Sequence, residues 1–246
     1  MTTGRYRRNY NEVKALGSLA NLPCVDCGQF EGVNRTDAQT THAYFFSENF
    51  LQQYHRILRA LSEKKHFSIS KNSRLYALAN LAMADAFITA WDSKRHFNFW
   101  RPVTAVQEGD DDGNPHTAGD TTWLPLINTP AYPDYTSGAN NLTGAFTRTL
   151  RLFFGKNKLN FTVTSNAPQL GDPDDPRRTR NYTRISDLAD DVVEARILLG
   201  IHFRFADVDA RRQGESVADW AFKHFLRPKH NRHHGHHWDG DDCDRD

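Results

Sequence analysis

Residues 73–91, SRLYALANLAMADAFITAW, are the stretch of this sequence that most strongly indicates a fold. Ser73 is suited to cap a helix, because its side chain can accept a hydrogen bond from a free backbone N–H. Apolar residues then occur on almost every side of the predicted helix: Leu75, Ala79, Leu81, Ala82, Ala84, Phe87 and Ile88. A helix that is apolar nearly all round is usually buried among others. The stretch therefore predicts the central helix of a bundle.

Further helices are indicated on both sides of this stretch by apolar spacing and end signals. They cover approximately residues 37–63, 137–155, 186–201 and 207–226. Residues 102–133 and 160–183 are rich in Gly, Pro and Asp and predict long loops, with a candidate short strand at NFTVTS (160–165) and no sheet. Long loops inside a compact domain are usually functional. The predicted fold class is all-α, a helical bundle with long functional loops.

We divide the chain into three predicted parts. Residues 1–36 are interpreted as a loop-rich N-terminal extension, residues 37–228 as the helical domain and residues 229–246 as a disordered tail rich in His and Asp. Cys24 and Cys27 form a Cys-x-x-Cys pair without further zinc ligands at suitable spacing, so a local disulfide or free thiols are expected. The tail histidines indicate no defined metal site.

Charge and hydropathy exclude several classes of protein. The 246 residues include 31 Lys or Arg and 30 Asp or Glu, whereas a general nucleic-acid binder usually has a clear basic excess. The mean hydropathy is −0.71, and no apolar run approaches the roughly 18 residues of a membrane span. No secretory signal is visible at the start. We expect a soluble protein, cytoplasmic or, if truncated from a precursor, periplasmic or secreted.

Three separated segments contain polar residues beside core-like sequence. Lys94 and Arg101 flank an aromatic stretch, RHFNFW, that we expect to be largely buried. Buried cations are costly unless they are paired or bind an anion, although two surface cations at a helix end are the alternative. Ser137 and Gly138 begin a helix, whose free N–H groups attract anions, although an ordinary N-cap is the alternative.

The third segment contains Arg196 among apolar helix residues and His202 near the end of that helix. A histidine in this position can also be a satisfied core residue. Arginine forks bind tetrahedral oxyanions bidentately. Lys94, Arg101 and Arg196, together with a hydroxyl and one histidine, therefore predict a site for phosphate or vanadate.

The order and spacing of these residues resemble the vanadium-dependent haloperoxidases and the related type-2 phosphatidic-acid phosphatases and bacterial acid phosphatases. That superfamily has the pattern Lys-x6-Arg-Pro, then Pro-Ser-Gly-His, then Ser-Arg-x5-His-x3-Asp. The first element is matched in full, and the middle of the second and the Arg-x5-His of the third are matched. The segments FWRP (99–102) and GIHFRF (200–205) are similar to the haloperoxidase branch. The resemblance extends over about residues 40–226.

The resemblance implies a vanadate cofactor, although phosphate could occupy the same site, since both are tetrahedral anions. Lys94, Arg101 and Arg196 would neutralise its oxygens, and Ser137 and the Gly138 amide would donate hydrogen bonds to it. His202 would be the axial vanadium ligand of a haloperoxidase, which oxidises a halide with hydrogen peroxide and acts on small organic substrates. In a phosphatase, His202 would be the nucleophile.

Two positions depart from the pattern. Ala139 occupies the place of the acid–base histidine, and the loss of a general acid typically costs about 10² to 10⁴ in rate. His96 or His116, from neighbouring loops, could take over that role. Asp207 is one residue beyond the expected aspartate, but a loop after Gly200 could still let Asp207 orient the His202 ring.

Three hypotheses follow for the function. The first is a haloperoxidase-like oxidoreductase with His202, Arg196, Lys94 and Asp207 as catalytic residues, and the second is a phosphatase of the same superfamily. The third is a non-catalytic binder of phosphate or vanadate. The chain is short for the haloperoxidase branch, whose members usually contain two helical bundles, so it is expected to be truncated or completed by a second copy in a homodimer.

Overall fold

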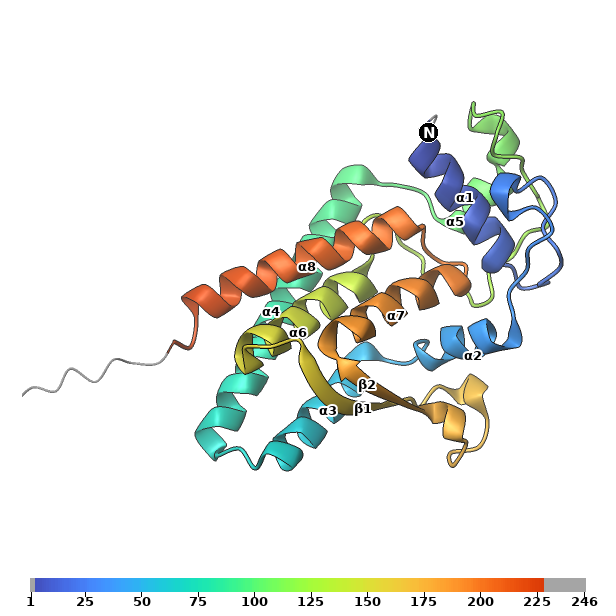
Figure 1. The fold of residues 1–246 in the computed structure, drawn as a ribbon. Helices are drawn as coiled ribbons and strands as arrows, with labels where there is room; N and C mark the ends of the chain where they lie inside the picture. Colours follow the sequence, from blue (N-terminus) through green and yellow to red (C-terminus); the bar gives the residue numbers. More distant parts are fainter. Residues whose placement is uncertain (1–2, 228–246) are drawn as a thin grey trace, which may run out of the picture.

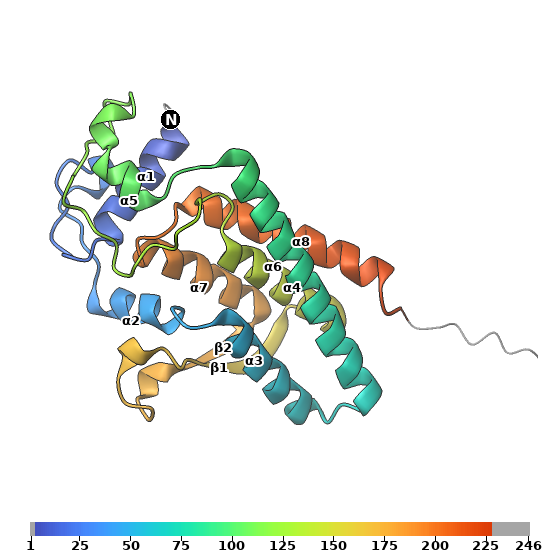
Figure 2. The same cartoon turned by 180° about the vertical axis from the view of Figure 1, so that it is seen from behind.

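Four helices form the centre of the molecule: α4 (Ile69–Phe97), α6 (Gly138–Phe154), α7 (Ile185–Leu198) and α8 (Arg204–His224). The computed structural model describes residues 3–227, and in it α6 packs against the other three (Figures 1 and 2). Gly144 and Gly214 permit the close approach of α6 and α8, because a Cβ atom at either would collide with a backbone oxygen of the opposite helix. The predicted helical-bundle fold is confirmed.

The predicted helix over residues 37–63 is in fact two helices, α2 (Asp37–Phe45) and α3 (Phe50–Lys65). Asn49 begins the second one, because its side chain accepts a hydrogen bond from the backbone N–H of Gln52. Phe45 and Phe46 are fully buried at the end of α2. The chain therefore turns where two consecutive aromatic side chains enter the core, which apolar spacing alone does not reveal.

Helix α4 is longer than predicted and is buried on one face only. It begins after Ser68, five residues before the predicted cap, and ends at Asn98, which has a φ of 43°. Phe87, Ile88 and Trp91 are 38%, 65% and 39% exposed. The prediction of burial all round is therefore wrong, because α6 and α8 lie against the inner side of α4 and leave its outer side uncovered (Figure 2).

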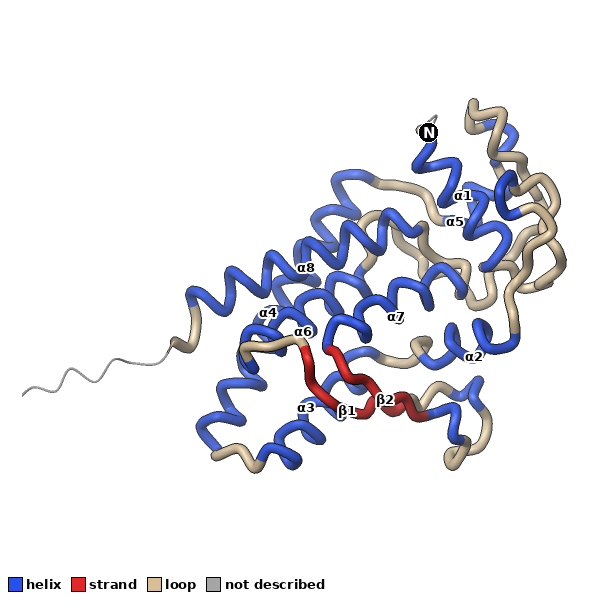
Figure 3. The backbone as a smooth tube through the Cα atoms, viewed as in Figure 1, coloured by secondary structure: helices blue, strands red, loops and turns tan. Residues whose placement is uncertain are grey.

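Strands β1 (Lys158–Thr164) and β2 (Thr179–Arg184) pair antiparallel at one edge of the bundle (Figure 3). Alternate residues of β1 are buried, namely Leu159, Phe161 and Val163. The candidate strand at NFTVTS lies here, but the sequence analysis missed the pairing. The reason is that β2 contains one buried residue, Tyr182, and so lacks a readable alternation.

The N-terminal segment contains helix α1 (Gly4–Leu16), which lies beside the short helix α5 (Pro102–Gln107). Tyr6, Tyr10 and Val13 are buried in one cluster with Phe203. The prediction of a loop-rich extension is therefore wrong for this helix. It was missed because polar residues share its buried side: Asn9, Asn11, Glu12 and Lys14.

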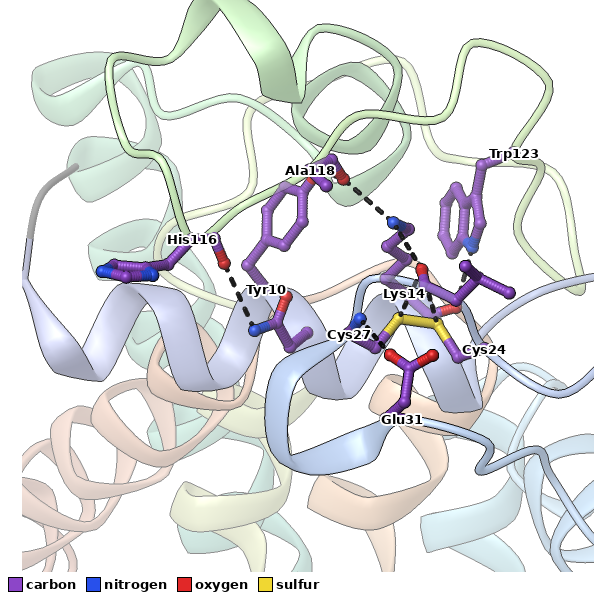
Figure 4. The surroundings of a disulfide bond; sticks show 10 residues. Tyr10, Lys14, Cys24, Cys27, Glu31, His116, Ala118 and Trp123 are labelled. Atoms are coloured by element: carbon purple, nitrogen blue, oxygen red, sulfur yellow. Dashed lines mark hydrogen bonds between the residues drawn. A yellow bond between two sulfur atoms is a disulfide. The ribbon is translucent and has the colours of Figure 1, made fainter.

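Cys24 and Cys27 form a disulfide in the loop after α1, as one of the two expected alternatives (Figure 4). The Nζ of Lys14 donates hydrogen bonds to the carbonyls of Val25 (3.1 Å) and Ala118 (3.0 Å), so it ties this loop and a second loop to α1. The predicted tail, residues 229–246, lies outside the described residues. Within residues 3–227, no helix combines the length and the apolar character needed to cross a membrane.

Candidate oxyanion site

The residues singled out in the sequence lie at the ends of helices that meet in the upper part of the bundle (Figure 1). Lys94 is in the last turn of α4, and Arg101 follows α4 directly before α5. Ser137 is the N-cap of α6, and its hydroxyl accepts from the backbone N–H of Asn140 at 3.4 Å. Arg196 is in the last turn of α7.

The three cations Lys94, Arg101 and Arg196 are 2%, 5% and 9% exposed, and we call them the cradle. The alternative interpretation as surface cations is therefore wrong. The expected burial of the aromatic stretch between the first two is correct only in part, because Phe97 is 55% exposed. Three buried positive charges in one region are costly unless negative charge compensates them.

Each cation of the cradle is held by backbone carbonyl groups. The Nζ of Lys94 donates to the carbonyls of Pro133 (2.7 Å) and Asp134 (2.8 Å). Burial and the neighbouring charge of Arg101 lower the pKa of Lys94 to about 7. These carbonyl contacts fix the side chain but bring no negative charge to it.

The two guanidinium groups keep N–H donors without a hydrogen-bond partner. Arg101 donates from Nε to the carbonyl of Tyr132 (2.8 Å) and from Nη1 to the carbonyl of Ile201 (2.6 Å), but its buried Nη2 has no hydrogen bond. Arg196 donates from Nη1 to the carbonyl of Phe46 (3.2 Å), and its buried Nε has none. Unsatisfied buried donors are rare and call for an explanation. A tetrahedral oxyanion supplies the missing acceptors, so the residues present fit vanadate or phosphate.

His202 lies between α7 and α8, just after Gly200, whose φ of 76° ends the helical path. Its ring is 2% exposed, and Nε2 lies 3.1 Å from Nη1 of Arg101. Burial, followed by the charge of Arg101, lowers the pKa of His202 well below its usual value. The imidazole is therefore neutral near pH 7, and a neutral ring nitrogen can ligate a metal.

The acidic partner of His202 is Asp134, which the sequence analysis did not identify. Oδ1 of this fully buried residue lies 2.5 Å from Nδ1 of His202 and 3.7 Å from Nη1 of Arg101. Burial raises the pKa of Asp134 to about 8, although Arg101 opposes the shift. The available signal was an acid three residues before Ser137, in a loop that leads into the site.

Asp207 does not take the place that was expected for it. Its Oδ1 accepts a hydrogen bond from Nδ2 of Asn140 at 2.7 Å, and the nearest acid to the His202 ring is Asp134 instead. The reason is that α8 begins at Arg204, so Asp207 is in its first turn and faces the start of α6. Burial raises the pKa of Asp207 to about 7.

Neither His96 nor His116 takes the place of the missing acid–base histidine. Ala139 is half-buried in the first turn of α6. His96 and His116, the suggested replacements, are both exposed. The ring of His96 packs on Phe97, at 4.7 Å between centroids, rather than in the buried cradle.

Aromatic side chains cover the outer side of the cradle. The ring of Tyr132 lies over Nζ of Lys94, at 5.1 Å, and over the guanidinium carbon of Arg101, at 4.8 Å. Trp91 packs edge-on against Tyr132, at 4.6 Å between centroids. A cavity of about 460 Å³ adjoins this corner and is lined by Arg101, Tyr132 and Thr129 among others.

Comparison with known proteins decides the family. Residues 74–231 match the family of the VCPO second helical-bundle domain, which is more than half of the chain. The chain belongs to the vanadium haloperoxidase family. The three cations of the cradle, Ser137 and His202 all lie within the matched residues.

Three individual relatives are between 18% and 29% identical to the chain in sequence. A vanadium chloroperoxidase from Curvularia inaequalis is 29% identical over 207 residues, covering 64% of this chain and 33% of that protein. A bacterial vanadium-dependent iodoperoxidase has a TM-score of 0.61 at 24% identity, covering 76% of this chain and 44% of the other. The apo form of a bacterial vanadium-dependent chloroperoxidase has a TM-score of 0.66 at 18% identity, covering 89% and 48%. The chain spans less than half the length of these relatives.

Proposed function

We propose that this chain is a vanadate-dependent haloperoxidase-like enzyme that uses hydrogen peroxide to oxidise a halide. The observation that supports it best is the pair of unpartnered, buried N–H donors on Arg101 and Arg196, beside a neutral His202. Vanadate, when bound, would supply a Lewis acid that polarises peroxide. The relatives are named as vanadium-dependent chloroperoxidases and an iodoperoxidase, which agrees with this proposal.

The residues of the chain would act on the bound anion in distinct ways. Arg101 and Arg196 would donate to its oxygens from preorganised positions, where a buried donor stabilises developing negative charge more than it would in water. Ser137 would orient its hydroxyl at the first turn of α6, where the Gly138 amide is one of the free N–H groups. His202 would offer a ring nitrogen as the ligand.

A second candidate function is favoured by one observation. Ala139 leaves the first turn of α6 without a proton donor, which would handicap both peroxide chemistry and a phosphatase reaction with His202 as the nucleophile. A protein that binds phosphate or vanadate without turnover would have the same cradle. The test must therefore measure binding and turnover separately.

We would measure bromination of a phenolic dye by the purified chain with orthovanadate and hydrogen peroxide, together with orthovanadate binding by equilibrium dialysis. Wild type should turn over only with vanadate, and Arg196→Ala should lose at least about 100-fold in turnover, since one preorganised donor contributes about that much. Arg148→Ala is the matched control, because the Nε of Arg148 donates to the exposed Asp219.

Each outcome selects one hypothesis. Vanadate-dependent turnover that is lost in Arg196→Ala supports the haloperoxidase. Binding without turnover in folded protein selects the non-catalytic binder. Hydrolysis of an activated aryl phosphate that disappears in His202→Ala selects the phosphatase.

A further inference from the structure

Two hydrogen bonds join the end of α2 to α7. The first runs from Nη1 of Arg196, on α7, to the carbonyl of Phe46, the residue that follows α2 (3.2 Å). Within residues 3–227 it is the one hydrogen bond of the Arg196 side chain. The second runs from Nε2 of His42, in the last turn of α2, to the carbonyl of Asp191, on α7 (2.8 Å). The donor and the acceptor of the first bond therefore lie on the two elements that the second bond joins.

The ring of His42 has a hydrogen-bond partner at each nitrogen. Its Nδ1 lies 2.7 Å from Nη1 of Arg180, in β2. An arginine N–H can only donate and a carbonyl can only accept, so Nδ1 presents its lone pair and Nε2 carries the proton. Burial, followed by the charge of Arg180, lowers the pKa of His42, although Asp191 and Glu194 oppose the shift. The neutral ring is therefore the form that fits both partners.

His42 and Arg180 also contact the aromatic turn after α2. The ring of His42 packs edge-on against the ring of Phe46, at 5.5 Å between centroids. The guanidinium carbon of Arg180 lies 4.8 Å from the ring centre of Phe45 and 5.8 Å from that of Phe46. Nη1 of Arg180 donates to Oδ2 of Asp191 at 3.3 Å as well. The turn that presents the carbonyl of Phe46 is therefore held against α7 by the two side chains together.

We propose that His42 is a positioning residue that joins α2 to α7 and so holds the carbonyl of Phe46 where Arg196 donates to it. The proposal rests on the proposed function only for the anion that Arg196 would bind. A donor that is fixed in advance binds more tightly than a mobile one, because less freedom is lost on binding. Ala43 of α2 and Leu198 of α7 belong to one apolar cluster, so the two helices should stay in contact without His42.

The first measurement is the state of Arg196 in the ligand-free protein. Arginine-labelled ¹⁵N spectra show the Nε–H signals of ordered side chains, and an Arg196→Lys spectrum identifies the signal of this residue. His42→Phe keeps a ring against Phe46 but removes both hydrogen bonds, so it should shift or broaden the Arg196 signal. His42→Gln keeps one donor and one acceptor on its amide, so its signal should lie closer to that of wild type.

The second measurement is the affinity for inorganic phosphate, by equilibrium dialysis. His42→Phe should weaken binding by about tenfold, the lower end of the range for one hydrogen bond to a charged group. His42→Gln should recover most of this loss. In an Arg196→Ala background, His42→Phe should have no further effect, since the two residues act through one interaction.

His55→Phe is the matched control. Nε2 of His55 joins two other helices, α3 and α4, through Oδ1 of Asn80 at 3.0 Å. This variant should leave the Arg196 signal and the phosphate affinity unchanged, because neither helix pair presents the carbonyl of Phe46.

The two measurements decide the role of His42. A changed Arg196 signal together with a loss of affinity that disappears in the Arg196→Ala background supports the proposal. An unchanged signal, or the same loss of affinity in both backgrounds, overturns it. If wild type binds no phosphate, the proposed function fails, while the ligand-free spectra still decide whether His42 positions Arg196.

Discussion

The cradle and a second group of cations at the N-terminal end of the bundle differ in what satisfies their charge. The second group lines a cavity of about 870 Å³ that includes Arg5, Arg7, Arg8 and Arg204, and we call it the arginine groove. This cavity is larger than the one beside the cradle, at about 460 Å³. Cavity size and the number of arginines would therefore both favour the groove as the functional site.

The hydrogen bonds favour the cradle instead. Arg204 donates to both Glu12 and Glu194, and Arg5 donates to both oxygens of Asp209, so acids bind two of these four cations, while Arg7 and Arg8 are exposed to solvent. In the cradle, carbonyl groups accept most of the hydrogen bonds and the buried Asp134 lies 3.7 Å from Arg101, but one guanidinium nitrogen of each arginine has no hydrogen bond. Between these two regions, burial with unmet donors, rather than charge or volume, therefore favours the cradle as the anion site.

The largest expected effect is a gain of function in the cradle. We expect Ala139→His to raise vanadate-dependent bromination by about 100-fold or more, because a positioned acid–base residue typically contributes about 10² to 10⁴ in rate. Ala139 is half-buried in the first turn of α6, next to Ser137 and Gly138. The measurement is the initial rate at saturating orthovanadate.

Ala38→His is the control for this gain, since Ala38 is exposed in the first turn of α2, the position in that helix that Ala139 has in α6. It should leave the rate unchanged. An Ala139→His variant that binds orthovanadate normally but turns over no faster would show that a proton donor at this position is not what limits the cradle.

The second prediction compares one arginine from each region. Arg101→Ala should weaken phosphate binding by about 100-fold, since hydrogen bonds to charged groups contribute about 1.5 to 3 kcal/mol each. Arg204→Ala should change phosphate binding less than about twofold, and should instead lower the free energy of unfolding, because Glu12 would be left buried without its partner. Calorimetric titration with phosphate and urea unfolding measure the two effects.

A stronger loss of phosphate binding in Arg204→Ala than in Arg101→Ala would reverse the assignment of the site. Equal losses would mean that phosphate responds to the net charge of the molecule rather than to unpartnered donors. Either result would remove the main support for the proposed function.

The sequence predicted the cradle better than its surroundings. Lys94, Arg101, Arg196 and His202 were found because each is a chemically unusual residue at a fixed spacing beside apolar sequence, and their burial follows from that sequence. Asp134 was missed because it lies in an irregular loop far from His202 in the sequence. The course of that loop brings the two side chains together, and no residue spacing predicts it. Contacts between distant segments depend on the fold, not on local pattern.

The same limit explains the errors in the fold. Helix α6 was predicted well, since Ser137 caps it and its apolar stripe is regular. Helix α1 was missed because it buries polar residues whose partners, such as the carbonyl of Ala118 for Lys14, lie about a hundred positions away in the chain. The outer face of α4 was predicted to be buried because it is apolar. An apolar face is buried only where another helix packs on it, and the sequence of α4 alone does not show whether one does.

The last prediction concerns a buried acid near the cradle and the response of the folding stability to pH. The pKa of Asp207 is raised from 3.8 to about 7 by burial, so the folded chain keeps a proton that the unfolded chain releases above about pH 4. The stability that this proton confers is complete below the unfolded pKa and is lost as the pH rises through 7. The full difference between the two pKa values corresponds to about 4 kcal/mol.

Urea unfolding at about pH 4 and about pH 7.5 measures this loss against Asp207→Asn, which keeps the oxygen that accepts from Asn140 and cannot ionise. Wild type should lose about 2 to 4 kcal/mol relative to Asp207→Asn between the two pH values. Asp190→Asn, at the exposed acid that pairs with Arg211, should follow wild type at both, because surface substitutions usually change stability by less than about 0.5 kcal/mol. If Asp207→Asn also followed wild type, Asp207 would behave like an acid of the arginine groove, and burial would no longer separate the two regions.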